Sequence, residues 1–422
     1  MGGERVPVSG RRGRVTVVLC LAFMLVLSAG CTGTEQSGDA SGLSGDETEY
    51  RTIVDSRGVE VQVPTEISRV VTVSDGLIES VMTVLGEEKK IVGVGSSCIQ
   101  RNFNYTFQTS DGETYEYKDG MNPVTYLNSW IMDLPLVGKS GTAINYETLA
   151  GLDPDVVILR AGSCTLRSMK DEGVQKTIWT IEDLGIPVVV LKAHPCYDDP
   201  DLSTISDEIR IIGEVFGKEE RAGELADYLE SQTSLVFERT IGIPEDEKPD
   251  VLVFGASPSS RKNGGAGNVK GIDTIESYFI EEIVHAKNAS QEPGNSVVVS
   301  AEHLLALDPD VIVLGTSSGY HPPEELYSAP YYQNVAELSA VKNLRVSSFP
   351  WEPCNCAKRL EYPIDVMVIA KAAYPDRFAD IDLGEWLLDF YKNVYGVDDE
   401  TAEALRSAQW MDWCVETCPT CG

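Results

Sequence analysis

Short aliphatic runs alternate with segments of helical periodicity over most of this chain. The folded part opens with a predicted strand at 69–73, a helix at 77–85 and a second strand at 91–95. Later runs such as VVIL at 156–159 are continuously apolar, which is typical of strands buried on both faces of a sheet. Strands of that kind occur in parallel sheets covered by helices, so the pattern predicts an α/β fold with mostly parallel sheets.

One stretch of this pattern occurs twice. The chain reads NYETLAGLDPDVVIL at 145–159 and SAEHLLALDPDVIVL at 300–314. Each copy begins with a residue that can cap a short helix, Asn145 or Ser300, and breaks at a Leu-Asp-Pro-Asp turn before the strand. The distance between the copies is far too long for a solenoid, so we infer two similar α/β lobes in tandem.

A strongly helical passage separates the two lobes. It runs from about residue 201 to residue 240, with an expected interruption at Gly217, and its second part is long enough to span about 30 Å. We expect an N-terminal lobe at 50–217, a rigid connecting helix at 218–241 and a C-terminal lobe at 242–397, with a ligand cleft between the lobes. Outside this scheme lie a polar insertion at 100–130, expected to be a loop or small subdomain, and a Cys-rich appendage at 398–422.

The first 30 residues have the layout of a secretory signal peptide. Arg11, Arg12 and Arg14 precede an apolar run at 15–27 that is too short to span a membrane. The run ends in Leu-Ser-Ala-Gly-Cys, which resembles the lipobox of secreted lipoproteins and implies lipid attachment to Cys31. The alternative is an ordinary signal peptide followed by a chance cysteine. Residues 31–49 predict a flexible tether, and we expect an extracytoplasmic protein that is lipid-anchored to the cell membrane.

The net charge of −32 at pH 7 argues against nucleic acid as a partner. The acidic residues are spread along the chain, which indicates a solvated surface and names no ligand. The sequence contains no Gly-x-Ser-x-Gly elbow, no phosphate-binding Gly-Lys-Thr and no His-Glu-x-x-His. These absences argue against catalysis, and we expect a monomer that is not an enzyme and carries no cofactor.

The motifs together resemble a known family. The lipobox, the two lobes joined by a long helix, the doubled Leu-Asp-Pro-Asp-Val copies, the Gly-x-x-Thr-Ile-Glu segment at 271–276 and the closing YPDRFADIDLGEWLLDFY at 374–391 carry the resemblance. They are similar to the periplasmic-binding-protein family of iron-siderophore, heme and vitamin B12 uptake. The resemblance covers about 51–396 and implies the binding subunit of an ABC importer. Such a subunit holds a metal chelate between its lobes and delivers it to a permease that works with an ATPase.

The resemblance also implies a role for the glutamate that recurs in the doubled stretch. In this family one exposed acidic residue in each lobe docks on arginines of the permease, and the matching positions are Glu147 and Glu302. The alternative reading is that each glutamate only favours the dipole of its helix, which contributes about 0.3–1 kcal/mol. Both roles are compatible with one position.

Ligands of open α/β sheets bind at the carboxyl ends of the strands, so the loops that follow predicted strands contain the candidate ligand-binding residues. Arginine or lysine in such loops would suit carboxylate or phosphate groups of a chelate, and tyrosine or tryptophan would suit a flat macrocycle. The alternative is that each arginine is an ordinary surface residue without a role in ligand binding. The candidates are Cys98, Arg160, His194, Arg261, Lys262, Tyr320, His321 and Trp351.

Cysteines gather in the same loops. A disulfide framework is one interpretation for an exported protein, and reduced thiols that contact a soft metal are the other. The candidate metal-binding thiols are Cys196, Cys354 and Cys356. Cys414, Cys418 and Cys421 have the spacing of an iron-sulfur triad, although a disulfide with a spare thiol or a small structural metal site also fits it. Two other functions therefore stay open: a subunit that binds a bare divalent or soft metal ion, with His194 and His321 as ligands, and a secreted thiol-redox or iron-sulfur protein.

Overall fold

The structure is a computed structural model, and it describes residues 49–139, 143–167, 169–197, 201–315, 321–353 and 357–415. The expectations for the signal peptide, Cys31 and most of the tether lie outside these residues, as do those for Tyr320, Cys354, Cys356, Cys418 and Cys421. No described helix is both long enough and apolar enough to cross a membrane.

The first lobe is built on a parallel sheet with the strand order β4-β3-β7-β8. The alternating side chains of β7 enter two different cores, because α1 and α5 cover one face of the sheet and α3 and α4 cover the other. A hairpin of β1 and β2 precedes the sheet. The bounds are β1 (Tyr50–Val54), β2 (Glu60–Pro64), β3 (Val70–Val73), α1 (Leu77–Leu85), β4 (Ile91–Val94), α3 (Tyr146–Gly151), β7 (Val156–Ala161), α4 (Glu172–Asp183), β8 (Val188–Lys192) and α5 (Ser203–Phe216).

The second lobe contains a larger sheet with the strand order β12-β10-β9-β13-β14, and β11 also pairs with β9. Strands β9, β11, β13 and β14 are parallel, whereas β10 and β12 are antiparallel additions. The predicted class, α/β with two lobes of mostly parallel sheets, is therefore confirmed. The bounds are β9 (Asp250–Gly255), α7 (Pro258–Lys262), β10 (Gly267–Val269), α8 (Ile275–Tyr278), β11 (Lys287–Asn288), β12 (Val297–Val299), α9 (Ala301–Leu307), β13 (Val311–Leu314), α10 (Pro323–Ser328), α11 (Ser339–Lys342), β14 (Val346–Ser348) and α12 (Tyr362–Ala373).

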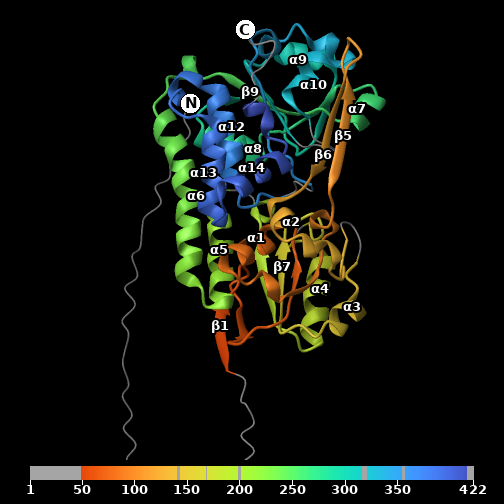
Figure 1. The fold of residues 1–422 in the computed structure, drawn as a ribbon, viewed down its shortest axis with the longest axis vertical. Coiled ribbons are helices and arrows are strands. Elements are labelled where there is room, and N and C mark those ends of the chain that lie inside the picture. The colour runs from red at the N-terminus through yellow and green to blue at the C-terminus, as the bar shows by residue number, and fades with distance from the viewer. Residues whose placement is uncertain are drawn as a thin grey trace, which may run out of the picture. The chain divides into compact units, whose positions relative to one another are not determined.

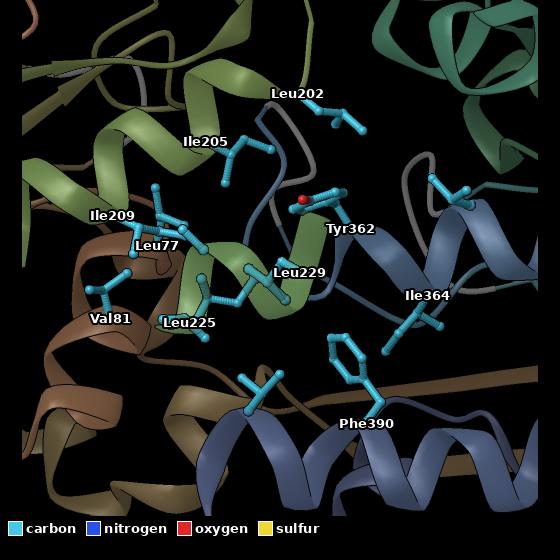
Figure 2. Packing of buried hydrophobic residues seen from close by; sticks show 14 of the residues in the cluster. Leu77, Val81, Leu202, Ile205, Ile209, Leu225, Leu229, Tyr362, Ile364 and Phe390 are labelled. Atoms are coloured by element: carbon cyan, nitrogen blue, oxygen red, sulfur yellow. The ribbon is translucent and has the colours of Figure 1, made fainter. Parts of the chain in front are cut away.

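Helix α6 (Glu219–Thr240) joins the lobes, and it begins after Gly217 ends α5 in a left-handed conformation with φ of 64°. Figure 2 shows Leu225 and Leu229 of α6 between the side chains of α1 and α5 and those of α12 and α13 (Leu383–Tyr395). Those side chains belong to one continuous apolar core. Because α6 shares its core with both lobes, it acts as a stiff connection between them.

The doubled stretch folds in the same way in both lobes. The side chain of Asn145 accepts a hydrogen bond from the backbone at the start of α3, and the side chain of Ser300 does the same at the start of α9. Both turns then place an aspartate in the left-handed region, Asp153 with φ of 47° and Asp308 with φ of 38°. Aspartate is one of the few residues that adopt this conformation readily, which explains the repeated Leu-Asp-Pro-Asp turn.

The insertion at 100–130 forms an antiparallel hairpin of β5 (Phe103–Gln108) and β6 (Thr114–Gly120), followed by α2 (Pro123–Leu127). Its tip is attached to the second lobe, because the backbone and hydroxyl groups of Ser110 both donate to the carbonyl oxygen of Ser328 at 2.8 Å. Phe107 is 5% exposed and lies in the core of the second lobe. Figure 1 shows the hairpin extending from the first lobe along the second. The insertion is therefore a strap between the lobes.

The appendage after α13 contacts this strap. Helix α14 (Asp399–Ala408) is followed by Trp410, whose indole nitrogen donates to the carbonyl oxygen of Lys118 at 3.0 Å. The backbone of Met121 donates to Ala408 at 3.0 Å. The two segments that depart from the family pattern thus pack against each other.

Candidate functional site

Arg160 is the last residue but one of β7 and is completely buried. Its Nε and Nη2 donate to the two carboxylate oxygens of Glu208 at 2.7 Å each, and its Nη1 donates to Asp75 at 3.3 Å. Burial alone would lower the pKa of Arg160, but these two carboxylates raise it above its usual value. The guanidinium therefore holds the strand end to α5 and to the loop after β3, and its charge is compensated within the protein.

His194 follows β8 at the same edge of the first sheet and is 5% exposed. Burial, together with the positive charges of Arg160, Lys358 and Lys270, lowers the pKa of His194 to about 3. Its Nδ1 is buried, and it has no hydrogen-bond partner within the described parts of the chain. Lys358 and Lys270 belong to the second lobe, so this neutral imidazole lies at the boundary between the lobes.

Arg359 ties the two lobes together at this boundary. Its Nε donates to the carbonyl oxygen of Asp75 at 2.7 Å, and its Nη1 lies 3.0 Å from Glu352 and 3.1 Å from the side-chain oxygen of Asn122. Lys358 beside it is paired with Glu276 at 3.1 Å and Asp365 at 2.7 Å. All of these charges are buried and paired, which is the condition under which a protein interior tolerates them.

His321 occupies the matching edge of the second sheet, where the Ser348 hydroxyl at the end of β14 donates to its carbonyl oxygen at 2.6 Å. It is 1% exposed, and its Nδ1 lies 2.8 Å from Glu325 and 3.3 Å from the hydroxyl of Tyr105 on the strap. The other ring nitrogen, Nε2, is buried without a hydrogen-bond partner among the residues described. The structure thus surrounds one side of His321 with polar groups and leaves the other nitrogen unpaired.

Arg261 and Lys262 lie on α7 of the second lobe. The Nη1 of Arg261 donates to the hydroxyl of Tyr332 and to the carbonyl oxygen of Ala256 at 2.8 Å, and the guanidinium lies 4.0 Å from the ring centre of Tyr331. Arg261 therefore braces the second lobe. Lys262 is exposed and lines a surface pocket of about 400 Å³.

Trp351 is 4% exposed and is packed by the chain itself. Its ring stacks on Trp410 of the appendage with centroids 5.2 Å apart, and the ring of Phe103 lies edge-on at 4.8 Å. Aromatic packing of this kind stabilises the strap against the second lobe. A flat macrocycle would have to displace these rings to reach Trp351.

The cysteines within the described residues divide into two classes. Cys98 and Cys164 are disulfide-bonded, which confirms the disulfide interpretation for these two, and Cys98 therefore offers no thiolate to a ligand. Cys196 and Cys414 are free thiols. Burial raises the pKa of both, to about 12 for Cys414, so each thiol is neutral near pH 7. Among the residues that the structure describes, no group of three or more His, Cys, Asp and Glu side chains is arranged to hold a metal ion.

Glu147 and Glu302 are both exposed in the first turns of α3 and α9. The two glutamates occupy equivalent positions because both copies of the doubled stretch fold in the same way. A protein that presents the same carboxylate from each of two similar lobes suits a partner with twofold symmetry.

Glu325, Tyr105 and Glu208 are site residues that sequence reasoning missed. The spacing of four between His321 and Glu325 was a usable signal, because residues at i and i+4 can meet on a helical turn. Tyr105 and Glu208 meet their partners only through tertiary folding, and the sequence contains no local sign of either contact.

Comparisons with known proteins extend these observations. A family model described as periplasmic binding protein matches residues 70–352. The molybdate-binding protein MolA of Haemophilus influenzae is 24% identical over 84% of this chain and 94% of its own length. YvrC of Bacillus subtilis, an uncharacterized ABC transporter substrate-binding lipoprotein, is 26% identical over 74% of this chain and 87% of its own. A solved periplasmic solute binding protein from Veillonella parvula is 23% identical with a TM-score of 0.66, covering 87% of this chain and 99% of that one.

Proposed function

This chain belongs to the periplasmic binding protein family and is the substrate-binding protein of an ABC importer, and we propose that it captures a metal chelate between its lobes. It acts outside the cytoplasm, as a binding protein and not as an enzyme, and it works with the permease of its transport system. Ferric siderophores, heme and corrinoids are the chelates that the family resemblance implies.

The state of His194 is the observation that supports a metal-containing ligand. A neutral imidazole offers a lone pair, and a buried nitrogen without a partner costs about 1–3 kcal/mol unless a ligand satisfies it. Burial and then the surrounding positive charges keep this ring neutral at the lobe boundary. A metal centre accepts the lone pair of such a ring, and the uncharged imidazole offers an oxyanion no positive charge.

A free oxyanion is the competing ligand, because MolA is a molybdate-binding protein and resembles this chain over most of its length. Arg160 does not favour that alternative, because its Nε and both terminal nitrogens are already bonded to carboxylates. Trp351 is already packed against Trp410 and Phe103. Among the chelates named above, this packing favours a compact complex over a flat macrocycle that would need the face of Trp351.

Equilibrium dialysis of the full-length protein, purified in mild detergent, tests the ligand class. The protein is dialysed separately against ferric catecholate, ferric hydroxamate, hemin, cobalamin and molybdate. We expect one metal chelate to be retained at one equivalent, and His194→Gln to weaken its binding at least tenfold, about 1.4 kcal/mol. Retention of molybdate alone, by wild type and variant equally, would overturn the proposal.

We also propose that Glu147 and Glu302 dock on the permease, because both are exposed at equivalent positions of the two lobes. Charge reversal, Glu147→Arg with Glu302→Arg, should abolish stimulation of the transporter ATPase in proteoliposomes while ligand affinity stays unchanged. Glu403→Arg is the matched control on an exposed face of α14. Loss of ligand affinity in the double variant would count against the docking role.

Lipid attachment at Cys31 completes the proposal. The lipobox-like string precedes the folded part by a short tether, and the relative YvrC is described as a lipoprotein. An anchored binding protein stays near its permease, because a tether raises the effective concentration of the two partners.

A further inference from the structure

The base of the strap is fixed by the appendage. Trp410 donates to the carbonyl oxygen of Lys118 at 3.0 Å. The two segments pack so closely that a Cβ added to Gly120 would lie 2.4 Å from the ring of Trp410. The base therefore cannot shift unless the appendage moves with it.

Beyond the base, a bulge interrupts the β5–β6 ladder. Phe103 pairs with Gly120, whereas the next pair in register is Tyr105 with Tyr117, so two residues of β6 oppose one residue of β5. A bulge bends a hairpin and ends its regular pairing. The segment beyond it, residues 105–117, is called the lid below, and the bulge is the point at which the lid can bend away from the base.

The lid is attached to the second lobe by its tip and by two aromatic side chains. The backbone and hydroxyl groups of Ser110 both donate to the carbonyl oxygen of Ser328, and the ring of Phe107 lies in the apolar core of the lobe. The hydroxyl of Tyr105 donates to Glu325 at 2.7 Å. A two-stranded hairpin is only marginally stable by itself, so the lid depends on these contacts to stay closed. Loss of such a local set of contacts requires less free energy than global unfolding.

The lid covers His321 at the carboxyl edge of the second-lobe sheet. The ring of Tyr105 lies edge-on to that of His321 with centroids 5.3 Å apart, and the side chain of His321 is completely buried. Its Nε2 is buried without a hydrogen-bond partner among the described residues. Opening of the lid lets water satisfy this nitrogen, which offsets part of the contacts that are lost.

We propose that the lid opens at the bulge and controls access to the carboxyl edge of the second-lobe sheet. Ligands of open α/β sheets bind at that edge, so the closed lid blocks the edge and the open lid exposes it. What enters rests on the proposed function, whereas the movement of the lid does not depend on it.

Reaction of His321 with diethyl pyrocarbonate measures this opening on the full-length protein, with no ligand added. The reagent attaches an ethoxycarbonyl group to an exposed imidazole nitrogen and releases ethanol and carbon dioxide. Mass spectrometry of the peptides gives a separate rate for each histidine. His303, which is exposed on α9 of the same lobe, is the internal control.

Ser110→Cys combined with Ser328→Cys locks the lid, because these residues already meet through two hydrogen bonds of 2.8 Å. Oxidation to the disulfide should slow the modification of His321 at least about tenfold relative to the reduced form of the same variant. The rate at His303 should be the same in both forms. The lock is at an exposed position, whereas the disulfide-bonded cysteines described above are buried, so mild reduction opens the lock alone.

Tyr105→Phe tests the attachment of the lid without a new disulfide. It removes the hydroxyl that donates to Glu325, so the modification of His321 should become about tenfold faster. Tyr126→Phe is the matched control, because Tyr126 is 38% exposed on α2 of the same insertion and its loss of a hydroxyl should leave the rate unchanged.

The outcomes separate the lid from the proposed function. A His321 rate that is equal in the oxidised and reduced lock would overturn the lid, as would a rate that Tyr105→Phe leaves unchanged or a His321 that never reacts. None of these results depends on the ligand, whose class the dialysis decides. Retention of molybdate alone would overturn the capture of a chelate and leave the movement of the lid intact.

Discussion

The two copies of the doubled stretch fold alike up to the end of their strands and then differ. In each copy an aspartate one residue before the strand accepts backbone hydrogen bonds at the start of the neighbouring strand. Asp155 accepts from Ser68 and Arg69 at 2.7 and 2.9 Å, and Asp310 accepts from Asp250 at 2.9 Å. Both aspartates therefore fix the register of the parallel pair that follows.

The residues at the carboxyl ends of the strands have different partners in the two lobes. In the first lobe Arg160 at the end of β7 is fully bonded to Glu208 and Asp75. In the second lobe His321, near the end of β14, keeps one buried nitrogen unpaired in the described part of the structure. The duplication therefore preserved the scaffold of each lobe, whereas the strand ends diverged. One is a structural anchor and the other is a candidate ligand contact.

Breaking the structural anchor should have the largest effect. Arg160→Met leaves the carboxylates of Glu208 and Asp75 buried without their counterion, so we expect a loss of about 3–5 kcal/mol in the free energy of unfolding. Urea denaturation followed by circular dichroism measures the change.

Two further variants control this prediction. Arg160→Met combined with Glu208→Leu replaces the main ion pair by apolar groups and should recover much of the loss. His321→Gln in the other lobe disturbs one buried hydrogen bond to Glu325 but leaves an amide that can donate to it, so we expect a smaller loss in the free energy of unfolding, about 1–3 kcal/mol. Equal destabilisation by Arg160→Met and His321→Gln would show that the two strand ends do not differ as described.

The pH dependence of stability tests the neutral state of His194. Its pKa is about 3 in the folded protein and near 6.5 in an unfolded chain, so between these values only the unfolded chain binds the proton. The free energy of unfolding therefore decreases as the pH falls below about 6.5, by about 2–3 kcal/mol at pH 4.5. Buried carboxyls such as Asp365, whose pKa burial raises to about 6, have the opposite effect, so the comparison must be made with a variant.

His194→Gln supplies that comparison because glutamine does not titrate. Relative to wild type, the variant should gain about 2–3 kcal/mol in the free energy of unfolding between pH 7 and pH 4.5, measured by urea denaturation. Identical pH profiles for the two proteins would mean that His194 is not held neutral at the lobe boundary.

The smallest predicted effect concerns the paired aspartates. Asp155→Ala removes the acceptor of two backbone hydrogen bonds and Asp310→Ala removes the acceptor of one. Because both sites are partly open to solvent, we expect losses of about 1–2 kcal/mol for Asp155 and about 1 kcal/mol for Asp310. A larger loss at Asp310, measured by thermal unfolding, would contradict an equivalent role for the two residues.

Local signals in the sequence predicted most of the scaffold. The capping residues Asn145 and Ser300, the break at Gly217 and the apolar strands all appear as expected, because each depends on contacts within a few residues or on a simple burial pattern. The predicted helix at 77–85 has the bounds of α1. The duplication itself was readable because both copies keep the same turn chemistry.

The candidate site was predicted only in part, because its contacts are nonlocal. His194 and His321 were found as polar residues after predicted strands, and both are buried at strand ends. Nothing in the sequence paired Arg160 with Glu208 or placed Tyr105 of the insertion beside Glu325. Such partners are determined by the packing of whole helices and strands. The sequence therefore suggested Arg160 as a ligand contact, although carboxylates of the protein itself compensate its charge.

Native mass spectrometry of the protein as purified, combined with elemental analysis, identifies the ligand that the protein captures. We expect one noncovalent adduct per chain that contains both a metal and an organic chelator, and we expect His321→Gln to retain less of it than His303→Gln. A metal oxyanion such as molybdate, bound without any organic ligand, would contradict the capture of a metal chelate.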